Sequence, residues 1–174
     1  PTNQFGWKAL GAVLKNLGKP HEALVAYKRA IKLSPRDEEA HSNLGVLQQE
    51  LGKLSAAATS LKKAISIKPN YPEAHYNLGG ILKELGNFEE AEKCYRQAIT
   101  NNLDYAKAHN NLGVTLHHLD RFQEAETSCR QAITLDPELA DAHNNLGIVL
   151  SQLNRLEEAE ICFKQAINLR HDFY

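Results

Sequence analysis

The chain has 174 residues, 43% of them hydrophobic, and a formal net charge of −1 at pH 7. This near-neutral charge gives no reason to expect nucleic acid as a partner, and no apolar run approaches the roughly 18 residues of a membrane span. The three cysteines stand in no metal-ligand or redox spacing, which excludes a disulfide framework and favours a reducing, cytoplasmic setting. They are Cys94, Cys129 and Cys162.

The sequence repeats itself every 34 residues from Gln4 onward. Numbering the positions in each repeat from 1, leucine recurs at position 7, glycine at position 8 and alanine at positions 20 and 27. We therefore expect one domain, residues 4–173, made of five repeats. Their bounds are 4–37, 38–71, 72–105, 106–139 and 140–173.

Each repeat contains two amphipathic stretches of about 13 residues, which predicts two helices per repeat and ten in all. In the fourth repeat they cover 107–119 and 122–134. Glycine in the intervening turn suits a left-handed helix end, and Asp120 and Asn154 tolerate that conformation in the last two repeats. Proline at position 32 in three repeats should end the second helix, since it disfavours helical geometry in the preceding residue. These prolines are Pro35, Pro69 and Pro137.

This pattern, with Trp7 at position 4 of the first repeat, resembles the tetratricopeptide repeat (TPR) family over essentially the whole chain. The resemblance implies an all-α fold, a right-handed superhelical solenoid whose first helices line a concave groove. The start at Pro1 and the lack of methionine suggest a segment of a longer protein. Because no polar capping helix follows Phe173, we expect the last repeat to expose apolar surface and to permit self-association through the terminal repeats.

A histidine column occupies position 4 of repeats two to five. Equivalent residues on stacked helices lie about 10 Å apart, whereas zinc ligands lie about 2.0–2.1 Å from one ion. Because Trp7 stands in the same column, we expect these histidines to pack between helices, and we expect no metal and no cofactor. The column is His41, His75, His109 and His143.

An asparagine column at position 6 is the candidate binding site. Asparagine is unfavourable in the middle of a helix, yet its amide can donate to and accept from a peptide backbone of any sequence. The TPR resemblance places this position on the groove, and the column resembles the asparagine ladder of O-linked N-acetylglucosamine transferases. Inheritance by duplication on a polar face is the alternative. The candidate residues are Asn43, Asn77, Asn111 and Asn145, with Lys8, Tyr76, Asn110 and Asn144 at position 5 and Lys107 at position 2.

The clamp by which chaperone-binding members of the family hold a C-terminal carboxylate is matched only in part. Lys8 and Asn43 fit that clamp, but Ala12 and Asn77 do not, and Glu73 would repel a carboxylate. We therefore expect a different mode of binding.

No phosphate loop, nucleophile elbow or isolated carboxylate pair is present, so we expect this segment to be non-catalytic. The leading hypothesis is a protein-interaction scaffold that binds an extended segment of a protein or peptide partner in the groove. One alternative is the substrate-recruiting arm of a larger enzyme such as an O-GlcNAc-type glycosyltransferase. Another is a structural module that assembles through uncapped ends.

Overall fold

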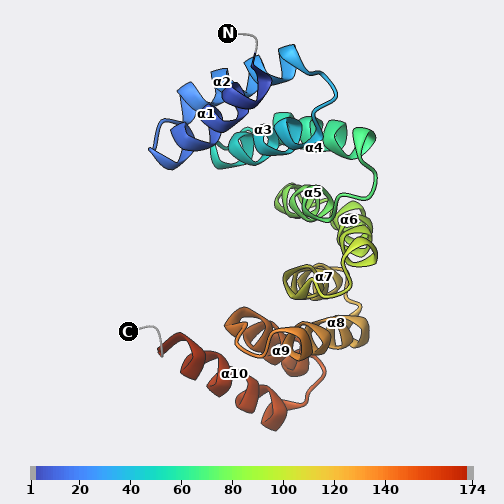
Figure 1. Ribbon diagram of the computed structural model, residues 1–174. Coiled ribbons are helices and arrows are strands. Elements are labelled where there is room, and N and C mark those ends of the chain that lie inside the picture. Colours follow the sequence, from blue (N-terminus) through green and yellow to red (C-terminus); the bar gives the residue numbers. More distant parts are fainter. Residues whose placement is uncertain (1–2, 172–174) are drawn as a thin grey trace. The chain divides into compact units, whose positions relative to one another are not determined.

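The structure, a computed structural model, describes residues 3–171, and helices are the only regular elements in that range (Figure 1). The end of the fifth predicted repeat and Phe173 lie outside the described residues. All ten predicted helices are present, and those of the fourth repeat match their predicted bounds to within one residue at each end. The helices are α1 Gln4–Asn16, α2 Pro20–Leu33, α3 Glu38–Glu50, α4 Leu54–Ile67, α5 Pro72–Glu84, α6 Phe88–Asn101, α7 Ala106–His118, α8 Phe122–Leu135, α9 Ala140–Gln152 and α10 Leu156–His171.

The chain divides into two compact units, and the division falls within α5, between Ile81 and Leu82. In the first unit α1 packs on α2 and α3, and α3 packs on α4. In the second unit α6 packs on α7, α7 on α8 and α9, and α9 on α10. Each unit is therefore a stack of helix pairs in which an element touches its sequence neighbours and the equivalent helix of the next pair. The single domain over 4–173 stays a prediction.

One turn geometry joins the two helices of every repeat. The residue after the C-cap has a positive φ in all five turns, and two backbone hydrogen bonds close each turn in the Schellman pattern. Asp120 and Asn154 adopt φ values of 56° and 58°, close to the 70–77° of the turn glycines, as the sequence predicted. In the last turn, for example, Arg155 N donates to Leu150 O over 2.9 Å.

The second helices end in extended backbone, but proline is not the only cause. Ser34, Lys68 and Asp136 each precede a proline and have φ between −128° and −142°. Asn102 precedes Leu103 and has the same extended geometry, with φ −151° and ψ 97°. By contrast α10, which also lacks the proline, continues to His171. Proline therefore accounts for the helix end in the first, second and fourth repeats. In the third repeat the second helix ends although no proline follows.

The glycine at position 8 lets the two helices of a repeat approach closely. A Cβ on Gly113 would lie 2.5 Å from Cys129 Sγ and 3.2 Å from the backbone oxygen of Ala125. A Cβ on Gly147 would lie 2.7 Å from the ring of Phe163. Position 8 of the first helix therefore packs directly on position 24 of the second, and even one methyl group would push the pair apart.

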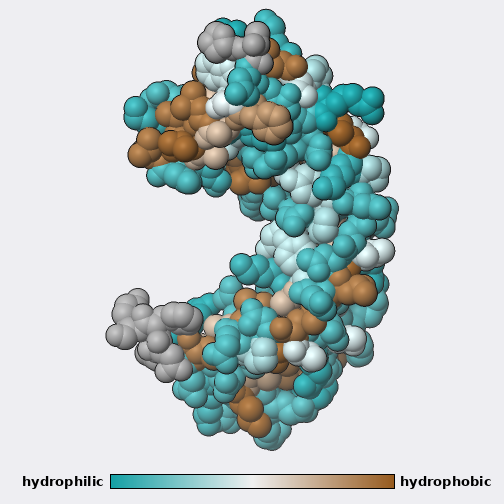
Figure 2. All heavy atoms as spheres, in the orientation of Figure 1, coloured by the Kyte–Doolittle hydropathy of each residue, from teal (hydrophilic) through white to brown (hydrophobic). Residues whose placement is uncertain are grey.

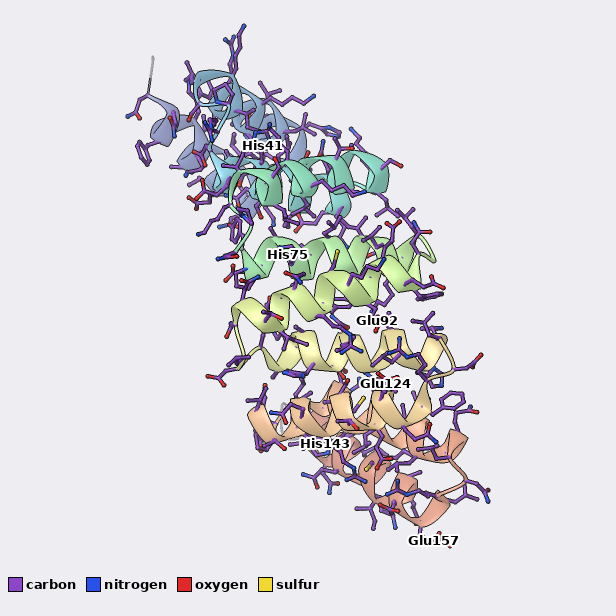
Figure 3. All side chains as sticks on the ribbon, turned by 90° about the vertical axis from the view of Figure 1, so that its right-hand side faces the viewer. His41, His75, Glu92, Glu124, His143 and Glu157 are labelled. Carbon is purple, nitrogen blue, oxygen red and sulfur yellow. The ribbon has the colours of Figure 1, made fainter. Side chains whose placement is uncertain are left out.

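The histidine column fastens each first helix to the loop that precedes it. Nε2 of His143 lies 2.9 Å from the carbonyl oxygen of Pro137, six residues earlier, and the other three histidines make the same contact. Figure 3 labels three members of the column, His41, His75 and His143. An Nε2–H group donates this hydrogen bond to a carbonyl of the loop that follows the second helix. The packing role was predicted, but the hydrogen bond was not. The other pairs are His41 with Pro35, His75 with Pro69 and His109 with Leu103.

The three cysteines are free thiols in helices. Cys129 is fully buried, and burial, followed by the nearby Cys162, raises the pKa of its thiol to about 12. A thiol with so high a pKa carries almost no thiolate at neutral pH and acts as an apolar filler.

Candidate peptide-binding groove

The asparagine column lies on the first helices, with Asn43 and Asn77 in the first unit and Asn111 and Asn145 in the second. All four side chains are half-buried, neither sealed in the core nor fully in solvent. This intermediate exposure suits groups that reach a surface from between packed helices. The column is therefore accessible to a ligand, although its members make different contacts.

Asn145 is the member of the column with the best-defined partner. Its Nδ2 donates a 2.9 Å hydrogen bond to Oδ1 of Asn110, which is buried at 8% exposure. The bond crosses from α9 to α7 and fixes the orientation of the Asn145 amide. Asn145 thereby keeps its own Oδ1 and its second N–H for another partner. Asn110, a predicted site residue, accepts this bond from a buried position, and its contact with a ligand stays a prediction.

A hollow of about 250 Å³ lies between α7 and α9 beside this amide. Its walls are mostly apolar, and the Asn145 amide and two histidine rings add polar groups. A concave apolar surface with a few fixed polar groups is the usual form of a binding pocket. The lining residues are Val114, His117 and His118 from α7 and Asn145, Ile148 and Val149 from α9.

His117, which lines the hollow, has a buried nitrogen, Nε2, that forms no hydrogen bond among the described residues. Burial, and then the charge of His118, lowers the pKa of His117 against the opposing effect of Asp120, so the ring is neutral at pH 7. A buried polar atom without a partner is unfavourable.

The rings next to the hollow are held in place by aromatic contacts. His118 stacks on Phe88 of α6 with centroids 4.5 Å apart, and His117 meets Phe122 of α8 edge to face at 5.6 Å. These contacts join α6, α7 and α8 and restrict both imidazoles. Two rings in the lining of the hollow thus pack against aromatic side chains of neighbouring helices.

Asn111 extends the polar surface of α7. Nζ of Lys83 lies 3.4 Å from its Oδ1, and burial lowers the pKa of this lysine despite the charge of Glu84. Lys107 is exposed at the start of the same helix, and Asn144 is half-buried on α9. In the second unit the predicted residues therefore gather on α7 and α9, the two helices that form the hollow.

The predicted residues of the first unit are placed differently. Lys8 is an internal anchor whose Nζ pairs with Asp37 at 3.2 Å and Glu39 at 2.6 Å. Burial opposes the charge of Lys8, but these two carboxylates outweigh it and raise its pKa. Its ammonium is therefore occupied and does not clamp a ligand carboxylate. Tyr76 is half-buried on α5, the helix that also carries Asn77.

Sequence reasoning missed Val149 and His118 as parts of the hollow. His118 directly follows His117 in the sequence and Val149 directly follows Ile148, and His117 and Ile148 also line the hollow. The lining of a hollow between two helices comes from several repeat positions on each helix, not from one column alone.

Residues 3–171 contain no group of three or more His, Cys, Asp or Glu side chains that could hold a metal ion. None of the helices in this range is both long and apolar enough to cross a membrane.

Helix pairs of equal design, joined by one kind of turn and stacked through equivalent faces, define an all-α helical-repeat protein. Models of the tetratricopeptide repeat match residues 72–105 and 104–171, and a TPR repeat model matches residues 11–52 and 50–86. The chain belongs to the tetratricopeptide repeat family. A comparison with curated protein sequences gives no match.

Solved structures confirm the TPR-solenoid fold class. The crystal structure of MamA is 25% identical, with a TM-score of 0.86 over 93% of this chain and 95% of MamA. YrrB, described as a TPR protein with an unusual peptide-binding site, is 21% identical, with a TM-score of 0.82 over 98% of this chain and 88% of YrrB. PilF of Pseudomonas aeruginosa is 19% identical, with a TM-score of 0.86 over 95% of this chain and 75% of that one.

Proposed function

We propose that this protein is an interaction scaffold that binds an extended segment of a protein partner on the α7 and α9 surface. One observation carries the proposal: the hollow joins apolar walls to the oriented amide of Asn145. Fixed amide groups recognise a peptide backbone whatever its sequence, while an apolar hollow selects a side chain. The segment recognised is therefore extended and carries an apolar residue.

The spacing of the repeats agrees with an extended ligand. Helices stacked about 10 Å apart match about three residues of extended chain, which advances about 3.3–3.6 Å per residue. Asn111 and Asn145, which are one repeat apart, thus have the spacing to contact two residues of the bound segment that are three positions apart. An apolar side chain between these contacts would enter the hollow against Ile148.

The test is binding to an unbiased peptide library by wild type and by Ile148→Lys. Ile148 is 38% exposed, so lysine there fills the hollow with a charged chain without disturbing the core. The matched control is Val25→Lys on α2, which is 57% exposed and is not among the residues that line the hollow. We expect wild type and the control to select the same peptides, enriched in apolar residues, and Ile148→Lys to lose them.

Circular dichroism checks that all three proteins are equally helical. Equal binding by Ile148→Lys and wild type would refute the use of this hollow. Failure of wild type to select any peptide would refute the proposed function itself.

The resemblance of the amide column to that of glycosyltransferase repeat domains supports a second proposal, in which the same surface recruits substrates for a larger enzyme. The two proposals differ in what the rest of the protein does. Reading the full open reading frame separates them, since the second requires a catalytic domain beside the repeats.

A further inference from the structure

One lysine of the second unit occupies the same place in its repeat as a residue that lines the hollow. Lys83 on α5 and Asn111 on α7 stand at positions 12 and 6 of successive repeats. His117 and Asn145 stand at the same two positions 34 residues later, and both line the hollow. Lys83 belongs to the second unit, which begins at Leu82. Its place relative to the hollow is therefore set by one step of the repeat.

The ammonium group of Lys83 contacts the asparagine column directly. Its Nζ lies 3.4 Å from Oδ1 of Asn111, and Lys83 is half-buried. An ammonium group has three N–H donors and no acceptor, and the Asn111 oxygen accepts from one of the three. The contact holds the positive charge beside a residue of the candidate binding surface.

The first repeat shows how this chain can neutralise a lysine at position 12. Nζ of Lys15 pairs with Glu50 at 2.7 Å, and Glu50 stands at position 13 of the following repeat. The corresponding residue for Lys83 is His118, whose ring stacks on Phe88 with centroids 4.5 Å apart. A stacked aromatic ring supplies no negative charge. The carboxylate that pairs with Lys15 therefore has no equivalent at this position beside Lys83.

The charge of Lys83 is not fully compensated within the described chain. Burial lowers the pKa of Lys83, and the opposing charge of Glu84, its neighbour in the sequence, is the smaller effect. Lys8 shows the reverse balance, because the carboxylates of Asp37 and Glu39 together outweigh burial and raise its pKa. A negative charge within about 4–6 Å favours the charged form of a lysine. A carboxylate brought by a ligand would therefore stabilise the Lys83 ammonium.

The other charges on the first helices of this unit also favour an acidic ligand. α7 carries the exposed Lys107 and no acidic residue. Apart from Glu84 at the end of α5, the acid on these helices is Asp141 of α9, whose carboxylate pairs with Arg170 at 2.8 Å. Figure 2 shows hydrophobic residues among hydrophilic ones over α7 and α9. The surface thus combines an apolar hollow with cationic side chains.

We infer that the bound segment carries an acidic side chain whose carboxylate pairs with Lys83, about three residues from the apolar side chain that enters the hollow. This inference rests on the proposed function and adds a second requirement to its ligand. One repeat of about 10 Å separates Lys83 from the hollow, and an extended chain covers that distance in about three residues. The partner is thus a protein segment in which an aspartate or glutamate and an apolar residue have this spacing.

Selection from a peptide library tests the pairing, with both peptide ends blocked so that only side chains supply carboxylates. We expect wild type to enrich peptides in which an acidic residue stands about three positions from an apolar one. Lys83→Gln should keep the apolar preference and lose the acidic one. Lys83→Glu should select lysine or arginine in place of the acid. A general loss of folding cannot produce this reversed preference, because an unfolded variant presents no binding surface.

Calorimetric affinities for one selected peptide give the size of the effect. Replacing its acidic residue by the corresponding amide should weaken binding to wild type about tenfold, since hydrogen bonds between charged groups are among the stronger ones. The same replacement should change binding to Lys83→Gln by less than about twofold, because the protein charge is already absent. The matched control is Lys93→Gln, which removes a lysine exposed on α6 and should bind both peptides as wild type does.

Three outcomes would overturn the inference. Wild type could select apolar peptides with no acidic residue at a fixed distance. Lys83→Gln could keep the acidic preference, and its loss in Lys107→Gln would then assign that preference to the other cation. The losses in affinity from the peptide change and from Lys83→Gln could be additive, which would exclude a direct contact. These outcomes leave the proposed function intact, whereas failure of wild type to select any peptide would refute both.

Discussion

The amide of Asn145 on α9 donates to the side-chain oxygen of Asn110 on α7 across 2.9 Å, and Asn110 is buried. Through this bond Asn145 contributes to the packing of two helices, in addition to its proposed role in binding. Replacing Asn145 removes the proposed ligand contact and a helix-to-helix contact together, so loss of binding in such a variant would have two explanations.

Replacing Asn145 with alanine should destabilise the protein. The substitution leaves Oδ1 of Asn110 buried without its donor, which costs about 1–3 kcal/mol in free energy of unfolding. The neighbouring Asn144→Ala should stay within about 0.5 kcal/mol of wild type. Urea unfolding followed by circular dichroism measures both. Equal stability of the two variants would show that the bond is unimportant in solution.

Replacing Gly113 with alanine should also destabilise the protein, although alanine is the better helix former. The new Cβ would meet Cys129 Sγ at 2.5 Å and the Ala125 carbonyl at 3.2 Å, and such overpacking costs about 1–3 kcal/mol. Gly6→Ala on α1 is the control, because its nearest atoms lie 3.7 Å away; it should gain up to about 1 kcal/mol. Thermal melts compare the two, and a gain from Gly113→Ala would contradict the packing of positions 8 and 24.

The free energy of unfolding should decrease as the pH falls through 6.5. Burial lowers the pKa of both His109 and His117 below this ordinary value, despite the hydrogen bond of His109 to Leu103. Between the lowered values and 6.5 the unfolded chain binds more protons than the native one, so acid favours unfolding. Urea unfolding at about pH 7.5 and about pH 5.5 should show the decrease.

The matched variant for this pH dependence is His109→Gln with His117→Gln. Glutamine keeps hydrogen-bonding capacity but does not titrate, so stability should vary less between the two pH values. A variant with the same pH dependence as wild type would assign the effect to other groups.

The helices could be predicted from the sequence because their signals are local. Apolar spacing within about 13 residues fixed α7 and α8 to within one residue, and the left-handed turns at Asp120 and Asn154 followed from residue type. The end of α6 could not be predicted in the same way, because Asn102 is extended without a following proline.

The site was only partly predictable, because its contacts depend on how two helices pack. The asparagine column and several groove residues could be read from the repeat, and their role in binding stays a prediction. The bond between Asn145 and Asn110 requires the distance between α7 and α9, which no repeat position encodes. The ion pairs between second helices of neighbouring repeats also require the structure, because Arg130 and Glu158 stand 28 positions apart and Glu126 and Arg155 stand 29 apart.

The regular spacing of the bonds from histidine to the preceding loop bears on how such a protein changes over generations. Each of these bonds joins residues six positions apart, so it is encoded within one period of the sequence. Recombination that gains or loses a whole period therefore keeps each remaining histidine with its partner. A one-residue insertion within a helix instead rotates the following side chains by about 100° and separates them all. The number of repeats in this protein is consequently free to vary, while the length of each repeat is not.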